Sequence, residues 1–380
     1  MYCRAREPAW APTPTTPMRS LRMASSPLCK NGLFKISISS PKNNRGDLVS
    51  KKLRAAVIGL HIGQTHAAKY RALDGVELVG LCDLDEGTLK QACERFGVEE
   101  GFRDAEEMMD RVKPDVVSLC TPPKSHLALT GAAARRGIHV LAEKPVAASP
   151  GDADGMIRVC RERGVTLMVG HKKVFSPPLM RLKALLERDL GPARFVIHRY
   201  PHPSTTDKAW FWSESDGQGP IFENAVHAAY TLRFLLGEPE RVCAEGGNLF
   251  AKRFAPQIDG AVCAIRFRGG AVASLSAGMV GVRTFRFEDY YVATEVGVAE
   301  VSGPFDNPDA LRYAFRDRPD DIHEESFPGA DPFLAEIRHF LDCVQSGKTP
   351  GVTGEDGRKA IELCLAIQEA VRSGRPVTLG

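Results

Sequence analysis

Lys144 is the residue whose position points most directly to chemistry. It follows the apolar run Ile138–Ala142, which predicts a buried parallel strand, and it is the centre of the tripeptide Glu143-Lys144-Pro145. The carboxyl ends of the strands in an open α/β sheet line the ligand crevice, so an ammonium group delivered there faces a site. Pro145 disfavours helical backbone at Lys144 and holds it extended. We therefore expect Lys144 to be an acid–base group, the alternative being a cation on the rim of the crevice.

A glycine turn earlier in the chain predicts a nucleotide-binding loop. An apolar strand leads into Gly59, His61, Ile62 and Gly63, and a helix is expected from Gln64. Such a turn places a pyrophosphate against the amino end of a helix. The loop is one residue shorter than the usual GxGxxG, and His61 occupies the position of the second glycine. Taken alone, the segment is also consistent with an ordinary tight strand-to-helix turn.

Asp83 favours a dinucleotide site over a simple turn. It ends the next predicted strand, 24 residues after Gly59, and an acid near that offset binds the ribose hydroxyls of adenosine. The residues after it, Leu84, Asp85 and Glu86, offer no cation for a 2′-phosphate, so we expect NAD rather than NADP. The alternative is that Asp83 only caps the following helix.

Other strand ends contribute further candidates. Thr121 and Pro122 follow the strand that ends at Cys120, and we expect them, together with Glu143 and Lys144, to lie beside the cofactor. His126 either lines the nicotinamide pocket or lies in the first turn of its helix. The ten cysteines are scattered without the spacing of zinc ligands, so we expect no metal.

Glu223 and His227 form a second pair with chemical potential. They lie four residues apart and would share one face of the helix predicted over residues 221–236. Oxidation of a secondary alcohol requires a proton acceptor within hydrogen-bond reach of the hydroxyl. We interpret His227 as the residue that takes or returns this proton, Lys144 as the group that polarises the oxygen, and Glu223 as the residue that orients the histidine or the substrate. Alternatively, His227 is a core histidine and Glu223 lies at the amino end of its helix for electrostatic reasons.

The order of the predicted elements gives the fold class. From residue 53 to about 171 strands and helices alternate, which predicts a doubly wound parallel sheet, a Rossmann-like NAD-binding domain. Residues 172–380 show segregated helices and a run of longer strands, typical of an α+β domain with a large, mostly antiparallel sheet. The hairpin turn is expected at 266–271, and the last helices at 332–346 and 354–373.

The sequence resembles the Gfo/Idh/MocA oxidoreductase family over nearly all of residues 53–380. The resemblance is carried by 114–126, by 137–145 with Glu-Lys-Pro, and by the tail segments 340–350 and 352–357. It implies an N-terminal Rossmann domain followed by an α/β domain whose open sheet often mediates oligomers. The family's lysine maps onto Lys144 and its nucleotide loop onto residues 59–63, and the resemblance leaves open whether Lys144 or His227 is the principal base.

The family's second motif maps onto residues 217–230. There Glu223 replaces the usual aspartate, Ala225 the usual glycine and Tyr230 the usual acid, whereas His227 is retained. The glutamate keeps the charge but moves it outward by one methylene, which changes the hydroxyl that it reaches. Tyr200, His202, Trp210 and Trp212 either stack on a sugar ring or pack a domain interface, and Lys172 and Lys173 stand where relatives more often have an amide and an arginine.

Charge and composition exclude several classes of partner. The net charge of +3 comes from residues 1–52, with ten basic and two acidic residues, whereas the rest of the chain has 40 basic and 45 acidic residues. We expect that extension to be disordered, as a targeting segment or a mis-assigned start. With no basic stripe and no apolar run long enough to span a membrane, we expect neither nucleic acid nor membrane as partner. Unpaired cysteines within apolar runs favour a cytoplasmic protein.

Together these features predict an NAD(P)-dependent oxidoreductase that transfers a hydride between nicotinamide and a secondary alcohol of a sugar, cyclitol or similar polyol. A homo-oligomer, dimer or tetramer, is expected. Two alternatives stay open: an NAD-dependent glycosidase or lyase that oxidises its substrate transiently, and a non-catalytic dinucleotide-binding regulator.

Overall fold

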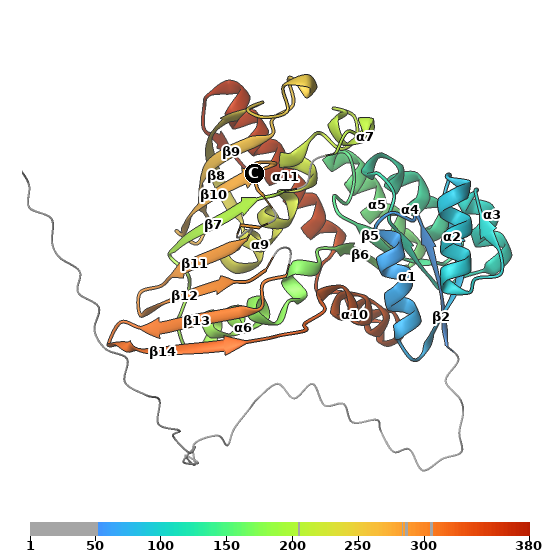
Figure 1. Ribbon diagram of the computed structural model, residues 1–380, viewed down its shortest axis with the longest axis horizontal. Coiled ribbons are helices and arrows are strands. Elements are labelled where there is room, and N and C mark those ends of the chain that lie inside the picture. Colours follow the sequence, from blue (N-terminus) through green and yellow to red (C-terminus); the bar gives the residue numbers. More distant parts are fainter. Residues whose placement is uncertain (1–51, 204–205, 283, 286–287, 305–306) are drawn as a thin grey trace, which may run out of the picture. The chain divides into compact units, whose positions relative to one another are not determined.

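The computed structural model describes residues 52–203, 206–282, 284–285, 288–304 and 307–380. The expectation for residues 1–52 therefore lies outside the described residues, except for Lys52. The described chain contains two sheets, which Figure 1 shows side by side with helices packed on them. Both predicted sheets are present.

The first sheet is wholly parallel and has the strand order β3-β2-β1-β4-β5-β6. This is the order of a dinucleotide-binding doubly wound fold, in which the direction of winding reverses between β1 and β4. Strands β4 and β6 are buried throughout and β5 is buried after its first residue, which explains their apolar runs. The strands are β1 (Leu53–Ile58), β2 (Val76–Cys82), β3 (Gly101–Phe102), β4 (Val116–Leu119), β5 (His139–Glu143) and β6 (Leu167–Gly170).

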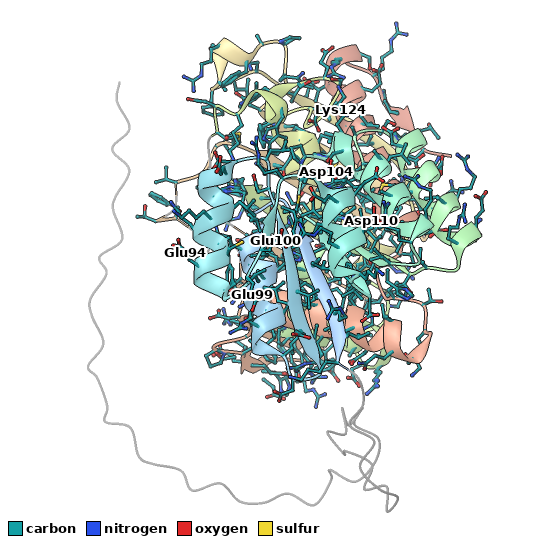
Figure 2. The ribbon with its side chains drawn as sticks, turned by 90° about the vertical axis from the view of Figure 1, so that its right-hand side faces the viewer. Glu94, Glu99, Glu100, Asp104, Asp110 and Lys124 are labelled. Atoms are coloured by element: carbon teal, nitrogen blue, oxygen red, sulfur yellow. The ribbon has the colours of Figure 1, made fainter. Side chains whose placement is uncertain are left out.

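Five helices connect these strands and cover the sheet: α1 (Gly63–Ala72), α2 (Glu86–Phe96), α3 (Ala105–Val112), α4 (His126–Arg135) and α5 (Pro150–Arg163). Side chains cap three of them, Asp85 on α2, Asp104 on α3 and Ser149 on α5. The helix α1 begins without a side-chain cap. Acidic side chains are spread over the outer face of α2 and α3, as Figure 2 shows for Glu94 and Asp110.

The second sheet has nine strands in the order β14-β13-β12-β11-β7-β10-β9-β8-β15. Only β7 and β10 pair in parallel, so the sheet is mostly antiparallel, as predicted. Its strands are β7 (Phe195–Pro201), β8 (Pro239–Gly247), β9 (Gly260–Phe267), β10 (Val272–Gly278), β11 (Asp289–Ala293), β12 (Gly297–Ser302), β13 (Ala310–Phe315), β14 (Arg318–Ser326) and β15 (Val377–Thr378). The predicted hairpin turn connects β9 and β10.

The other helices of the described residues are η1 (Pro123–Ser125), η2 (Lys172–Phe175), α6 (Pro177–Arg188), α7 (Ala209–Trp212), α8 (Pro220–Glu223), α9 (Val226–Leu236), η3 (Lys252–Phe254), α10 (Pro332–Ser346) and α11 (Gly354–Ser373). One prediction is wrong in detail, because the helix expected over 221–236 is interrupted at Asn224 and Ala225. The helix α10 returns to the first sheet's side of the molecule and packs on α1 (Figure 1), with Lys69 and Asp331 paired at 2.6 Å.

Candidate active site

A cavity of about 1020 Å³ opens at the carboxyl ends of the parallel strands. All predicted site residues line it except Gly63 and His126: those present are Gly59, His61, Ile62, Asp83, Thr121, Pro122, Glu143, Lys144, Glu223 and His227. The structure therefore brings the nucleotide loop and the proposed acid–base groups to one place. Ligands of open α/β sheets bind at this edge, beside the strands where the winding reverses.

The glycine loop has the shape of a phosphate cradle. Gly59 has φ +87°, and a Cβ atom there would lie 2.6 Å from the carbonyl oxygen of Cys120. A Cβ atom on Gly63 would lie 2.8 Å from Val57, so α1 approaches the sheet closely. The first turn of α1 has neither a side-chain cap nor an acidic residue, so its backbone N–H groups suit an anion. These features fit a dinucleotide pyrophosphate.

Asp83 lies at the wall of the cavity and supports the loop. Its Oδ2 accepts a hydrogen bond from the backbone N–H of Leu60 at 2.6 Å, and its Oδ1 accepts one from Asp85 at 2.9 Å. The capping alternative for Asp83 is wrong, because Asp85 caps α2 by accepting from the N–H of Thr88. Carboxylate oxygens can accept further bonds, so Asp83 remains able to bind ribose hydroxyls.

Arg103 is a residue that the sequence argument about NADP missed. The backbone N–H of Asp83 donates to Phe102 at 3.1 Å, so the end of β3 lies beside the end of β2. Arg103 follows directly and lines the cavity together with Asp83. Arg103 is thus a cation that reaches the cavity from another strand, so the absence of a cation at Leu84, Asp85 and Glu86 does not by itself exclude a 2′-phosphate.

Thr121 and Pro122 line the cavity, whereas His126 is buried behind them. The two ring nitrogens of His126 lie 3.0 Å from the carbonyl of Val146 and 2.9 Å from that of Thr121. The side chain thus connects the segment after β4 with the segment after β5. Of the two alternatives for His126, the structure places it in the first turn of α4, away from the cavity wall.

Lys144 and Glu223 form an ion pair inside the cavity. The Lys144 ammonium donates to Glu223 Oε1 at 2.7 Å and to the backbone oxygen of Glu223 at 3.0 Å. Both side chains are mostly buried, 15% and 13% exposed, so the pair is shielded from solvent and strong. The peptide bond between Lys144 and Pro145 is cis. Glu223 is therefore paired with Lys144, and its predicted role of orienting His227 or the substrate stays a prediction.

The interruption between α8 and α9 makes this pair possible. In a regular helix the carbonyl of Glu223 would accept from the N–H of His227. Here the N–H of His227 donates to Asn224 at 3.3 Å instead, and the N–H groups of Asn224 and Ala225 both donate to Pro220 at 3.0 Å. The carbonyl of Glu223 is thereby turned toward Lys144. Spacing alone could not predict this break.

The imidazole of His227 is buried and neutral. The residue is 7% exposed and lines the cavity, and its Nδ1 has no hydrogen-bond partner among the described residues. Burial, followed by the charges of Lys144 and Lys173, lowers the pKa of His227 well below its ordinary value. Burial likewise lowers the pKa of the neighbouring His171 to about 3. The His171 ring stacks on Tyr230 with centroids 4.4 Å apart.

The Glu143 carboxylate accepts a hydrogen bond from the backbone of Lys144. Its Oε2 accepts from the Lys144 N–H at 2.9 Å, and its Oε1 lies 3.0 Å from His66 Nε2. His66 Nδ1 lies 3.1 Å from the hydroxyl of Ser118. Burial alone would raise the pKa of Glu143, but the bond to His66 and the charge of Lys144 bring it below its ordinary value. Glu143 is therefore an ionised support for the lysine.

Aromatic and basic side chains form another part of the cavity wall. Tyr200, His202 and Trp210 line the cavity, and Lys172 also contributes, with its ammonium 4.1 Å from the ring centroid of Phe333. Stacking of these aromatic rings on a sugar stays a prediction. Trp212 does not line the cavity: it is buried and stacks on Phe254 with centroids 4.3 Å apart. Lys173 lies behind the wall, paired with Glu288.

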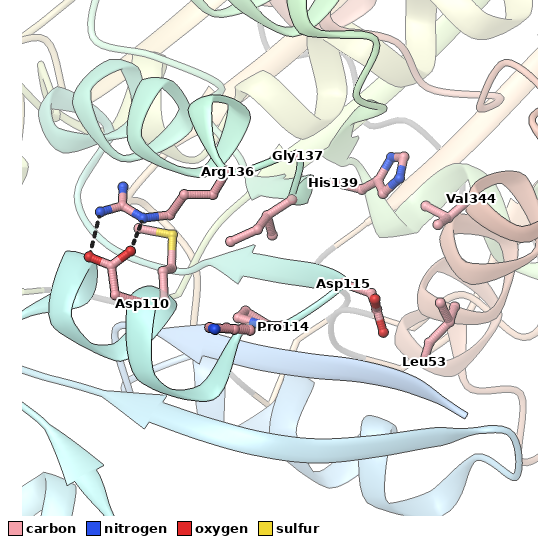
Figure 3. A pocket seen from close by; sticks show the side chains of 11 residues that line it. Leu53, Asp110, Pro114, Asp115, Arg136, Gly137, His139 and Val344 are labelled. Atoms are coloured by element: carbon pink, nitrogen blue, oxygen red, sulfur yellow. Dashed lines mark hydrogen bonds and ion pairs between the residues drawn. The ribbon is translucent and has the colours of Figure 1, made fainter. Parts of the chain in front are cut away.

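A second cavity of about 520 Å³ lies at the opposite end of the parallel strands. Figure 3 shows its lining, with Leu53, Asp115 and His139 near the amino ends of the strands and Asp110 paired with Arg136. This edge is not where ligands of such sheets bind. In the part of the chain that the structure describes, no helix is long and apolar enough to cross a bilayer, and no cluster of side chains suits a metal ion.

Comparison with known families gives matches over most of the chain. Residues 53–171 match the description "oxidoreductase family, NAD-binding Rossmann fold" of the Gfo/Idh/MocA proteins. Residues 179–293 match the Gfo/Idh/MocA C-terminal domain, and 306–379 match the oxidoreductase family's C-terminal α/β domain. The match therefore extends over both sheets.

Individual relatives are similar over nearly their whole length. The chain is 28% identical to a myo-inositol 2-dehydrogenase of Thermotoga maritima, covering 86% of this chain and 98% of that one. It is 26% identical to a D-xylose 1-dehydrogenase (NADP⁺) of Haloferax volcanii, covering 80% and 92%. Among solved structures, an aldose-aldose oxidoreductase of Caulobacter crescentus in complex with glycerol is 26% identical, with a TM-score of 0.77 over 86% of this chain and 100% of that one.

Proposed function

Because the chain belongs to the Gfo/Idh/MocA oxidoreductase family, whose matched relatives are dehydrogenases of CH–OH groups, we propose that it oxidises a secondary alcohol of a sugar, cyclitol or similar polyol with NAD. The observation that carries this proposal is the shared cavity, in which the Lys144–Glu223 pair and His227 face the same space as the glycine loop.

The residues of the loop would hold the dinucleotide. The first turn of α1 and the cradle at Gly59 suit the pyrophosphate, and Asp83 suits the adenosine ribose. When bound, the nicotinamide supplies the hydride acceptor for the carbon of the alcohol. We favour NAD because the 2′-phosphate of NADP would lie against the negatively charged Asp83 carboxylate. Because one relative is named as an NADP⁺ enzyme, both cofactors are to be tested.

The hydroxyl proton of the substrate is transferred to a side chain of the protein. His227 is neutral because its pKa is lowered, so its ring can accept the hydroxyl proton of the substrate. The Lys144 ammonium donates a hydrogen bond to the same oxygen and stabilises the negative charge that develops there. Glu223 keeps Lys144 in place, and Glu143 fixes the lysine's backbone. Histidine is thus the base and lysine the electrostatic partner.

The test is a panel of sugars, cyclitols and amino sugars offered with NAD and with NADP, with NADH or NADPH followed by absorbance. Net accumulation of reduced cofactor with at least one polyol, lost in Lys144→Met, supports the proposal. Turnover without net accumulation would instead indicate transient oxidation. Equal or faster turnover with NADP would contradict the argument from Asp83.

The predicted homo-oligomer also remains a proposal. One face of the nine-stranded sheet exposes apolar side chains, with Phe195 44%, Ile197 40% and Val262 60% exposed. Such a patch on a sheet face is typical of an interface between subunits. Light scattering of the purified protein would give the mass, and a monomer at micromolar concentration would contradict this expectation.

A further inference from the structure

A loop of the C-terminal domain, residues 206–219, reaches the nucleotide-binding loop. Lys208 and Trp210 from this loop line the same cavity as Gly59, Leu60 and His61. The loop includes the short helix α7, which is labelled in Figure 1. The wall of the cofactor cavity therefore comes from both domains.

Two hydrogen bonds attach this loop to the N-terminal domain. The backbone N–H of Lys124 donates to Asp216 Oδ1 at 3.0 Å, and Gln218 Nε2 donates to the carbonyl of Ala148 at 2.7 Å. Asp216 is only 8% exposed, so its bond is shielded from competing water. The end of the loop is thus fixed next to the strands that carry the cofactor site.

The beginning of the loop is fixed as well. Trp212 Nε1 donates to the carbonyl of Thr206 at 2.7 Å, which closes the chain around Lys208. The Trp212 ring stacks on Phe254 with centroids 4.3 Å apart. Lys208 is therefore presented by a segment anchored on both sides, and its position at the cavity wall follows from these anchors.

The charge of Lys208 acts on the glycine loop. Its ammonium group has no ion pair or hydrogen bond among the described residues, and the nearby loop contains His61 where the second glycine usually stands. Burial, and then the charge of Lys208, lowers the pKa of His61. The cation is thus close enough to influence the position at which the usual loop would bring its backbone to a phosphate.

We propose that Lys208 binds the pyrophosphate of the dinucleotide across the cavity, and that it compensates for the short glycine loop. A phosphate oxygen accepts a charge-assisted hydrogen bond from an ammonium group. The glycine loop and the 206–219 loop both line the cavity in which the pyrophosphate would lie. The inference rests on the proposed function only in that a dinucleotide is the cofactor. It adds a binding residue from the C-terminal domain, so that the bound cofactor would contact both the Rossmann domain and the C-terminal domain.

Binding measurements test this directly, without turnover. NAD⁺, ADP-ribose and adenosine are titrated into the full chain by calorimetry or by displacement of NADH fluorescence, using wild type, Lys208→Met, Lys208→Arg and Lys252→Met. Lys252 is the matched control, because it is an exposed lysine on the adjoining loop and lies outside the cavity. Adenosine is the matched ligand, because it lacks phosphate.

We expect Lys208→Met to weaken NAD⁺ and ADP-ribose about tenfold, and Lys208→Arg to restore most of the affinity. Adenosine should bind all four proteins equally, and Lys252→Met should match wild type. Unchanged NAD⁺ affinity in Lys208→Met would overturn the inference, as would an equal loss of adenosine. Failure of the wild type to bind NAD⁺ would refute the proposed function itself, so the two failures are distinguishable.

Discussion

Substitution of Gly59 by alanine should lower the free energy of unfolding by more than backbone strain alone would, and it should also weaken cofactor binding. A residue with a Cβ at φ +87° pays about 1–2 kcal/mol for the left-handed conformation. The new Cβ would also lie 2.6 Å from the carbonyl oxygen and 2.7 Å from the carbonyl carbon of Cys120, which are backbone atoms of the segment after β4. Forcing such an overlap costs about 1–3 kcal/mol more, since β1 and β4 must separate.

Gly75 provides a matched control for the strain. It has φ +81°, and a Cβ there would meet nothing within 4 Å. Gly75→Ala should therefore cost about 1 kcal/mol, the conformational strain reduced by the lower entropy of the unfolded chain. With the same net strain and the overlap added, Gly59→Ala should cost about 2–4 kcal/mol in total and weaken NAD⁺ binding at least tenfold, because the cradle beside Cys120 is displaced.

The assay is urea unfolding followed by tryptophan fluorescence and circular dichroism, together with NAD⁺ titration of each folded variant. If Gly59→Ala and Gly75→Ala lose the same stability and bind NAD⁺ equally well, the close approach of Gly59 to Cys120 has no energetic weight. The reasoning about the cradle would then be refuted.

Three further outcomes follow from the site. Glu223→Gln should lower kcat/KM about a hundredfold with NAD⁺ affinity unchanged, because the amide cannot hold the Lys144 charge, and Glu223→Asp should lose less. Lys173→Met combined with Glu288→Gln should move the acid limb of the kcat/KM profile to higher pH. The charge of Lys173 lowers the pKa of His227, so without that charge the pKa rises. His227 is then protonated, and unable to accept the substrate proton, up to a higher pH. Arg103→Ala should reduce kcat/KM with NADP about tenfold and leave kcat/KM with NAD within about twofold.

Each of these outcomes has a clear contrary result. Equal activity of Glu223→Gln and wild type would show that the ion pair is only structural. An acid limb that stays in place, or moves to lower pH, would remove His227 as the titrating base. Equal losses with both cofactors in Arg103→Ala would place Arg103 away from the 2′ position.

Much of the fold could be predicted because local patterns and global packing agree. The buried parallel strands need apolar runs, and side-chain caps and glycines mark the helix ends, so the last two helices were predicted at the bounds that the structure has. The strand-end rule likewise placed Lys144, Asp83 and Thr121 in one crevice.

What could not be predicted depends on contacts between residues far apart in sequence. Arg103 comes to Asp83 through the pairing of β2 with β3, and Phe333 reaches the cavity only because α10 returns to α1. The interruption at Asn224 and Ala225 leaves the carbonyl of Glu223 to Lys144, which lies far away in sequence. No periodicity within 221–236 indicates that contact.

The most direct test of the account is the rate of NADH formation in a single turnover, measured by stopped flow with the best polyol of the panel. The account predicts net NADH with wild type, and a rate lower by about a thousandfold in Lys144→Met, although that variant binds NAD⁺ within about twofold of wild type. A Lys144→Met variant that forms NADH within about tenfold of the wild-type rate would contradict the central claim that the Lys144–Glu223 pair and His227 carry the reaction.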